Sequence, residues 1–482
     1  MKKNIFNIIK LLLVLTGVLF HFQCSFYGQR QYDTQELKTI IKNINLHGGI
    51  KPPVEKENKI NWIGYWKNEG KRKVLIHKVL DEFSLLHQNV QVNMKFPEDI
   101  AEIQNIDAPY FEQIPRYVAK MIKNDSIEWD IIPIIGAAYS LIGKQLNDPD
   151  WGHKYLVDFR NVPGFDETQK DFILNDPKYM KDTDGIYIGP CIEGYYYAIF
   201  YNKEVADIIG LNVKHFNMKF EDLLNYVKEV ADYNKQHGTN FAAFHDSGDW
   251  VTIEILFQHL FKSAINYSSE YTIPDYFTQK NKRGLLQTLK AFEELGKYDP
   301  LIESAESYRW DNSKGVVLNN KALFYVNGSW MYNNWEVIDK EKVKKMIPAE
   351  LPVFDQINYY MGGYSPNFAV LKNSPNKDLA IELLMHWTNK DFVQDWIRYA
   401  KSPSGTYGYM DAKGFGGDVH EVFVNSISEK YGNNIGYYDT DLDYLFGSNH
   451  SIPYTRFCQY LHALLRREKT AQEVFYGLMR YF

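Results

Sequence analysis

The sequence predicts an α/β protein built from two lobes. Near the start of the folded part, residues 61–66 are short and apolar as in a strand, and apolar residues then recur at helical spacing over 75–86. Residues 129–135 form a continuous apolar run, which is typical of a strand buried on both faces. Strands that alternate with helices predict a parallel sheet with right-handed crossovers. At 482 residues, the chain is also longer than one compact core usually covers.

The remaining elements follow in order along the chain. Extended segments or strands are predicted at 90–94, 186–190, 194–201, 241–244 and 322–326, and helices at 115–123, 220–230 and 457–465. Gly238 can end the helix that starts near Phe220, and Thr470 with Glu473 forms a capping box for the last helix. The turn at 182–185 marks the point where we expect the chain to leave one lobe for the other.

The composition is that of a globular protein, with 45% hydrophobic and 24% charged residues. Fifty-four basic side chains stand against sixty acidic ones, which gives a net charge of -6. A protein that binds nucleic acid needs an excess of positive charge to neutralise phosphates. We therefore expect no nucleic-acid partner.

Residues 1–24 have the pattern of a signal peptide. A basic start precedes an apolar run at 11–22, which is shorter than the roughly 20 residues of a membrane-spanning helix. Cys24 follows this run and resembles the acylated cysteine of a bacterial lipoprotein, although Gln23 and His21 depart from that pattern. An acyl chain on Cys24 would tether the mature protein to a membrane surface. An ordinary cleaved signal and an uncleaved anchor remain as alternatives.

Residues 25–58 are polar and rich in glycine and proline, and they are predicted to be a tether before the first strand. The other two cysteines, Cys191 and Cys458, are far apart and show no spacing typical of a disulfide framework. We expect two buried thiols, with a disulfide between them as the alternative. A monomer is the expected state.

Sequence signatures of catalysis, metal binding and cofactor binding are missing. The chain has no phosphate-binding loop and no nucleophile elbow, and His420-Glu421 lacks the second histidine of a zinc-binding helix. Asp439, Asp441 and Asp443 match the first half of a calcium loop, but the turn glycine and the bidentate glutamate are absent. We therefore expect no catalytic residue, no metal and no cofactor.

Aromatic and acidic residues recur where predicted strands end. The carboxyl ends of parallel strands share one edge of a sheet, and ligands of open α/β folds bind there. A sugar needs a flat aromatic face for its C–H groups and fixed acceptors for its hydroxyls. The predicted ligand-binding residues are Trp66, Glu69, Asp130, Glu193, Tyr195, Asp246, Trp250, Trp330 and Tyr364.

The order of these segments resembles the extracellular solute-binding proteins of ABC importers, in the branch of maltose- and oligosaccharide-binding proteins. The most specific match is Tyr201-Asn202-Lys203-Glu204, which is similar to the segment after the first crossing between lobes in that family. Residues 326–330 are similar to the Asn-Gly-Ser/Pro-Trp segment of the family. The resemblance also covers residues 61–66, 362–371 and 453–465, and it runs in collinear order from about 59 to 482.

The resemblance implies the type II periplasmic-binding-protein fold, whose two α/β lobes close on a ligand by a hinge motion. By analogy, residues 59–190 and 364–412 form the first lobe, and residues 195–358 and 416–482 form the second. The implied function is to bind an extracellular carbohydrate, in particular an oligosaccharide, and to deliver it to the permease subunits of an ABC importer. The protein is then exported, either periplasmic or membrane-anchored.

Two alternatives stay open at this level. An exported glycan-processing enzyme could use two carboxylates of the same cleft, at a separation of about 5 to 9.5 Å. The same fold could instead bind a peptide, an organic acid or a chelated metal.

Overall fold

A computed structural model describes most of the chain after residue 57. The described residues are 58–67, 69–87, 90–108, 110–135, 138–169, 185–190, 193–248, 250–266, 279–358, 360–365, 368–387, 392, 395–396, 399–401, 418–431, 435–436 and 454–481. They all belong to one compact unit, Glu57–Phe482. The predicted signal peptide, Cys24, almost all of the predicted tether, Cys191 and the acidic run at 439–443 lie outside the described residues.

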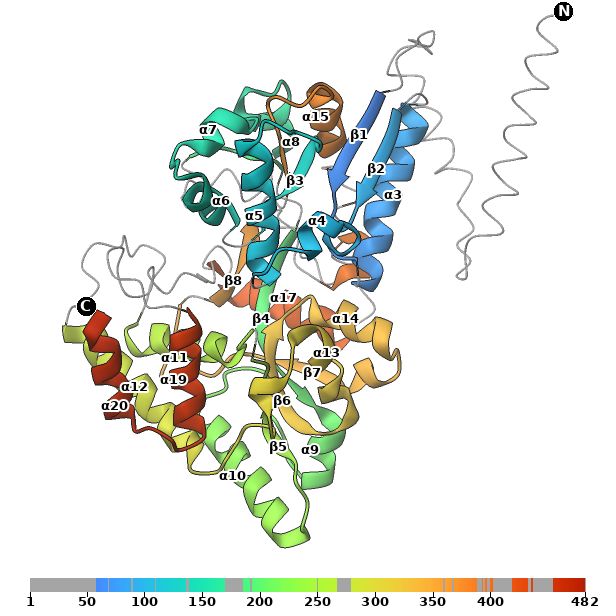
Figure 1. Cartoon of the computed structure of the whole chain (residues 1–482). Helices are drawn as coiled ribbons and strands as arrows, with labels where there is room; N and C mark the ends of the chain where they lie inside the picture. Colours follow the sequence, from blue (N-terminus) through green and yellow to red (C-terminus); the bar gives the residue numbers. More distant parts are fainter. Residues whose placement is uncertain are drawn as a thin grey trace, which may run out of the picture. The chain divides into compact units, whose positions relative to one another are not determined.

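The first sheet has the strand order β2-β1-β3-β9. Strand β1 (Asn58–Ile63) pairs in parallel with β2 (Val90–Lys95) and β3 (Ile131–Pro133), which confirms the predicted parallel sheet. Strand β9 (Phe368–Val370) returns from late in the chain and pairs antiparallel with β3. Helix α3 (Gly70–Leu86) lies alongside β1 and β2 in Figure 1. It buries the predicted apolar stripe, including Leu75, Val79 and Phe83.

The second sheet has the order β10-β8-β4-β6-β5, and β7 also pairs with β4. Its strands are β4 (Glu193–Asn202), β5 (Ala242–His245), β6 (Ala322–Gly328), β7 (Met346–Ala349), β8 (Tyr360–Ser365) and β10 (Ile435–Gly436). Strands β5 and β6 run parallel, whereas β4 runs antiparallel to β6 and β8. The carboxyl ends of β5 and β6 and the beginning of β4 therefore share one edge.

Helices pack around both sheets (Figure 1). The longer ones are α5 (Tyr110–Lys123), α6 (Ala138–Leu146), α10 (Phe220–His237), α11 (Ile253–Ala264), α12 (Gln279–Gly296), α14 (Met331–Ile338), α15 (Lys377–His386), α17 (Val419–Tyr431), α19 (Tyr454–Leu465) and α20 (Ala471–Leu478). Shorter ones are η1 (Pro97–Asp99), α4 (Ala101–Gln104), α7 (Trp151–Tyr155), η2 (Phe159–Asn161), α8 (Phe165–Gln169), α9 (Lys203–Ile209), η5 (Ala305–Ser307), α13 (Trp310–Ser313), η6 (Val316–Asn319), η7 (Lys342–Lys345) and η9 (Met479–Tyr481).

Local signals in the sequence explain several helix ends. Gly238 has a φ of 65° and ends α10, as predicted, because a left-handed backbone suits glycine. Thr470 and Glu473 form the predicted capping box of α20. Cys458 is buried in α19, as predicted, whereas Cys191 lies outside the described residues, so the expected pair of thiols and the alternative disulfide both stay predictions.

The described part of the chain shows neither a membrane-spanning helix nor a metal-binding cluster. Among its helices, none is both long and apolar enough to cross a bilayer. Within the same residues, no group of three or more His, Cys, Asp or Glu is placed to hold a metal ion.

Candidate functional site

Four partly exposed aromatic side chains gather at the shared edge of the second sheet. Trp330 follows β6, Trp250 follows β5, Tyr195 lies near the start of β4, and Trp310 begins α13. The ring centroid of Trp330 is 5.5 Å from that of Tyr195 and 6.1 Å from that of Trp250, and the Trp250 and Trp330 planes differ by 20°. Trp310 meets Trp250 edge-on at 5.5 Å. We call Tyr195, Trp250, Trp310 and Trp330 the aromatic wall.

The Asn-Gly-Ser-Trp segment at the end of β6 builds the centre of this wall. A Cβ atom on Gly328 would lie 2.1 Å from the Trp330 ring, so the ring packs directly against the backbone of Gly328. The Ser329 amide donates to the Tyr196 carbonyl at 2.8 Å, and the Tyr196 amide donates to the Ser329 hydroxyl at 3.3 Å. These contacts fix Trp330 beside β4.

The structure places Trp66 in the core that adjoins the first sheet. Its side chain is only 6% exposed, and it packs against Phe368 and Trp396 with ring centroids 5.6 and 5.1 Å away. The Arg72 guanidinium lies 5.7 Å from the Trp66 ring centroid. Trp66 has a φ of 68°, a left-handed conformation that is costly for a bulky residue and that the surrounding packing maintains.

Glu69 lies three residues after Trp66, immediately before α3. Its carboxylate accepts from Arg72 at 2.8 Å, and its side chain is 12% exposed. Burial raises the pKa of Glu69, and the hydrogen bond and charge of Arg72, with a smaller contribution from Lys314, oppose the rise. Lys314 also lies 4.7 Å from the ring centroid of Trp310. Glu69 is therefore linked electrostatically to a residue that contacts the Trp310 ring of the aromatic wall.

The carboxylate of Asp130 already has protein partners. It accepts from the Asn61 amide at 2.5 Å, from the Ser374 hydroxyl, and from the Asn376 side chain at 3.4 Å. The residue is 2% exposed. These bonds join β1 to the segment that follows β9, so Asp130 holds the first sheet together.

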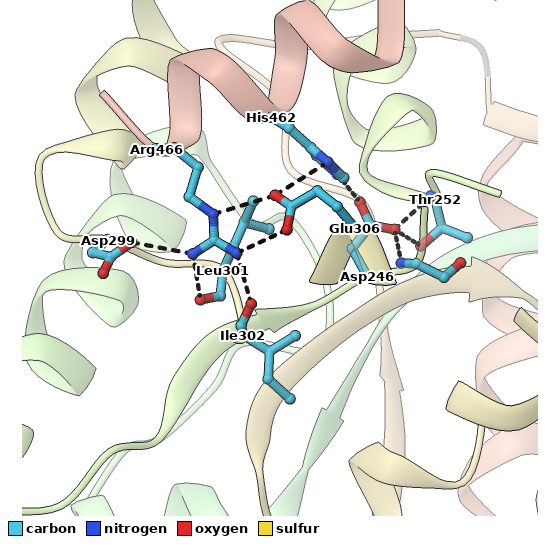
Figure 2. A network of polar contacts seen from close by, with 9 residues as sticks. Asp246, Thr252, Asp299, Leu301, Ile302, Glu306, His462 and Arg466 are labelled. Atoms are coloured by element: carbon cyan, nitrogen blue, oxygen red, sulfur yellow. Dashed lines mark hydrogen bonds and ion pairs between the residues drawn. The ribbon is translucent and has the colours of Figure 1, made fainter. Parts of the chain in front are cut away.

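The carboxylate of Asp246 is also occupied. One oxygen accepts from the amides of Ser247 and Thr252 at 2.9 and 2.8 Å, and the other lies 3.0 Å from Nε2 of His462. Figure 2 shows these contacts meeting at the fully buried carboxylate. Asp246 thus fixes the loop that carries Trp250.

Glu193 and Tyr364 lie on neighbouring strands at the join between β4 and β8. Glu193 is opposite Ser365, and Gly194 is opposite Tyr364. The described part of the structure includes their backbones and not their side chains, so their contact with a ligand stays a prediction.

Sequence reasoning missed Trp310, Arg72 and Lys314. None of the three directly follows a predicted strand, and the sequence predicts ligand-binding residues at the ends of strands. The nearest available signal was the Tyr308-Arg309-Trp310 cluster, in which aromatic and cationic residues adjoin.

Comparisons with known proteins bear on the family and the fold of the chain. A family model described as bacterial extracellular solute-binding protein matches residues 101–418. No curated protein sequence matches the chain. The GacH receptor of Streptomyces glaucescens GLA.O, solved unliganded and with acarbose, superposes with a TM-score of 0.61 at 15% identity, over 89% of this chain and 99% of that one.

Two further solved structures are similar. Maltose-bound T. maritima MalE3 gives a TM-score of 0.61 at 14% identity and covers 88% of this chain and 98% of its own. RafE of Streptococcus pneumoniae in complex with raffinose gives a TM-score of 0.56 at 12% identity and covers 86% of this chain and 100% of its own. At these identities the likeness shows the fold alone. The fold is the two-lobed α/β fold that the sequence predicted.

Proposed function

The chain belongs to the bacterial extracellular solute-binding protein family, and we propose that it captures an oligosaccharide and delivers it to an ABC importer. Members of this family bind solutes and are not enzymes. Family membership therefore accounts for a small-molecule ligand and an importer. The choice of an oligosaccharide is our proposal.

The aromatic wall is the observation that carries this proposal. Sugar rings expose apolar C–H faces, and they stack on flat aromatic rings. Trp250 and Trp330 are almost parallel and partly exposed, and contacts with Trp310 and Tyr195 hold them in place. Because the rings are ordered before a ligand arrives, binding costs less side-chain entropy.

Glu69 is the acidic residue that we propose for hydroxyl recognition. Arg72 donates to the Glu69 carboxylate and so orients it. The positive charge of Lys314, which lies over the Trp310 ring of the aromatic wall, also acts on the pKa of Glu69. A ligand that contacts both Glu69 and the wall would favour a closed arrangement of the lobes by its higher affinity for that state. Asp130 and Asp246 are left out of the proposed contacts because both oxygens of each carboxylate contact protein groups, whereas the hydrogen bond of Glu69 to Arg72 uses Oε2.

A thermal-shift screen tests the ligand class. Acarbose, maltose and raffinose were solved with proteins of this fold, so maltotriose and raffinose are suitable first probes, beside a dipeptide and citrate. A ligand at 100 times its Kd stabilises the native state by about 2.7 kcal/mol. We expect a shift with an oligosaccharide, recovered intact by mass spectrometry. Stabilisation by the dipeptide or citrate alone would refute the proposal that the ligand is a carbohydrate.

We also propose that Cys24 carries the acyl group of a lipoprotein. The basic start, the short apolar run and the position of the cysteine support this. Expression with a labelled fatty acid in a bacterial host should label the wild-type chain and not the Cys24→Ala variant. Equal labelling of both would contradict the assignment.

A further inference from the structure

His462 of α19 lies between two carboxylates. Its Nε2 is 3.0 Å from Oδ2 of Asp246, and its Nδ1 is 3.5 Å from Oε1 of Glu306 (Figure 2). A neutral imidazole carries one N–H and can donate to one of these oxygens, whereas an imidazolium donates from both nitrogens. The arrangement therefore suits the charged form of His462.

The other charged groups around His462 also affect its ionisation. Arg466, just after the end of α19, contacts Glu306 with Nε at 3.3 Å and Asp299 with Nη1 at 3.5 Å, and it donates to the Ile302 carbonyl at 2.8 Å. Burial opposes the charge on His462, but the hydrogen bond and charge of Asp246, helped by Glu306 and opposed by Arg466, leave its pKa above the usual 6.5. Asp246 and Glu306 come from other parts of the chain, and Arg466 comes from the turn that follows α19.

The same carboxylate of Asp246 holds the loop that ends at Trp250. The Asp246 carboxylate accepts from the Ser247 and Thr252 amides. The Ser247 hydroxyl also closes the loop by donating to the Trp250 carbonyl at 2.6 Å. A Cβ atom on Gly248 would lie 2.0 Å from the Glu306 carbonyl oxygen, so the loop packs tightly against η5. Both carboxylates that flank His462 thus belong to the loop or to its neighbour.

We propose that His462, as an imidazolium clamped between Asp246 and Glu306, is a positioning residue that keeps Trp250 stacked on Trp330. The effect on binding rests on the proposed function of the aromatic wall, but the positioning itself does not. When His462 loses its proton, the neutral ring keeps one N–H for Asp246 and loses its charge attraction to Glu306, so the loop that carries Trp250 loses its link through His462 to η5.

Near-UV circular dichroism without any ligand tests the positioning. Two stacked indoles couple, so the difference between the spectra of the wild type and Trp250→Phe reports on the Trp250 ring and its neighbours. We expect this difference signal to be largest at low and neutral pH and to fall as the pH rises through the pKa of His462, above 6.5. The same difference spectrum can be taken between His462→Gln and the double variant Trp250→Phe/His462→Gln. It should be weaker than in the wild type and should not change as the pH rises through the pKa of His462. His237→Gln, at an exposed histidine, is the matched control and should behave as the wild type.

Glu306→Gln gives a second test if His462→Gln does not fold. Glu306 is 46% exposed in its side chain, and its charge favours the imidazolium. The near-UV difference signal is taken between Glu306→Gln and the double variant Trp250→Phe/Glu306→Gln. Because the Glu306 charge is gone, the fall of this signal should move to lower pH. An unchanged midpoint, or a wild-type signal that is constant from pH 5.5 to 9, would overturn the proposal. Failure of every sugar to bind would instead refute the proposal of a carbohydrate ligand, and it would leave the positioning role of His462 unaffected.

Discussion

Trp250 and Trp330 stack with ring centroids 6.1 Å apart and planes 20° apart, although they follow different strands. They meet because β5 and β6 are parallel neighbours, so the loops after both strands leave the sheet at the same edge. Tyr195 joins them from β4, which runs antiparallel to β6. A single feature of sheet topology thus assembles most of the aromatic wall.

Replacing Trp330 with alanine should weaken oligosaccharide binding strongly. The ring lies at the centre of the wall, and loss of one stacking ring costs about 1 to 3 kcal/mol by analogy with base stacking, or roughly 5- to 150-fold in Kd. Isothermal titration calorimetry with the sugar found in the screen measures this. Tyr476→Ala, which removes an exposed ring from α20, should leave the Kd unchanged. Equal affinity of Trp330→Ala and wild type would remove the wall from the binding site.

Replacing Asp130 with alanine should lower stability and spare binding. The change leaves the partly buried amide of Asn61 and the buried hydroxyl of Ser374 without their acceptor, and each such loss costs about 1 to 3 kcal/mol. Urea unfolding should show a loss of about 2 to 6 kcal/mol for the two groups together. Asp150→Ala, at an exposed aspartate, is the control. If Asp130→Ala kept full stability but lost sugar affinity, Asp130 would return to the proposed ligand contacts.

Much of the fold was predictable because its signals are local. The spacing of Leu75, Val79 and Phe83 specifies which face of α3 is buried, whatever that helix packs against. Gly238 marks a helix end through its left-handed backbone, and the Thr470–Glu473 pair marks one through side-chain hydrogen bonds within a single turn. In contrast, the mixed pairing around β4 depends on strands that arrive from distant parts of the chain, such as β8 and β10. No local pattern specifies that pairing.

The site was predictable only in part, for a related reason. An acidic residue after a strand looks the same in the sequence whether it faces a ligand or caps its own backbone. Asp130 and Asp246 do the latter, and their decisive partners include Ser374 and His462, far along the chain. The rings of Trp250 and Trp330 were easier to place, because the parallel strands before them determine where they emerge.

The ionisation of Glu69 should make a distinct contribution to the pH dependence of stability. Because its pKa is raised in the folded protein, Glu69 contributes stability that is fully present below about pH 4.5, the usual pKa, and is lost as the pH rises through the folded pKa. Glu69→Gln removes this loss. The unfolding free energy of Glu69→Gln relative to wild type should therefore increase as the pH rises above 4.5.

Glu473→Gln is the matched control for this experiment. Hydrogen bonds from the backbone and side chain of Thr470 lower the pKa of Glu473. Its contribution is present above the usual pKa of 4.5 and is lost as the pH falls, so the pH trend of Glu473→Gln should have the opposite sign. Urea unfolding at several pH values measures both. Parallel trends for the two variants would contradict the raised pKa of Glu69.

Replacing Gly328 with alanine should disturb the aromatic wall without touching an aromatic residue. The added Cβ would lie 2.1 Å from the Trp330 ring, so the ring must move away from β4 and from its stacked position on Trp250. We expect a loss of sugar affinity of the same order as in Trp330→Ala and a weaker near-UV signal from the stacked pair. Gly315→Ala is the control, because the nearest atom to its added Cβ is at an ordinary 3.5 Å. Full affinity in Gly328→Ala would mean that the ligand does not need Trp330 where β6 places it.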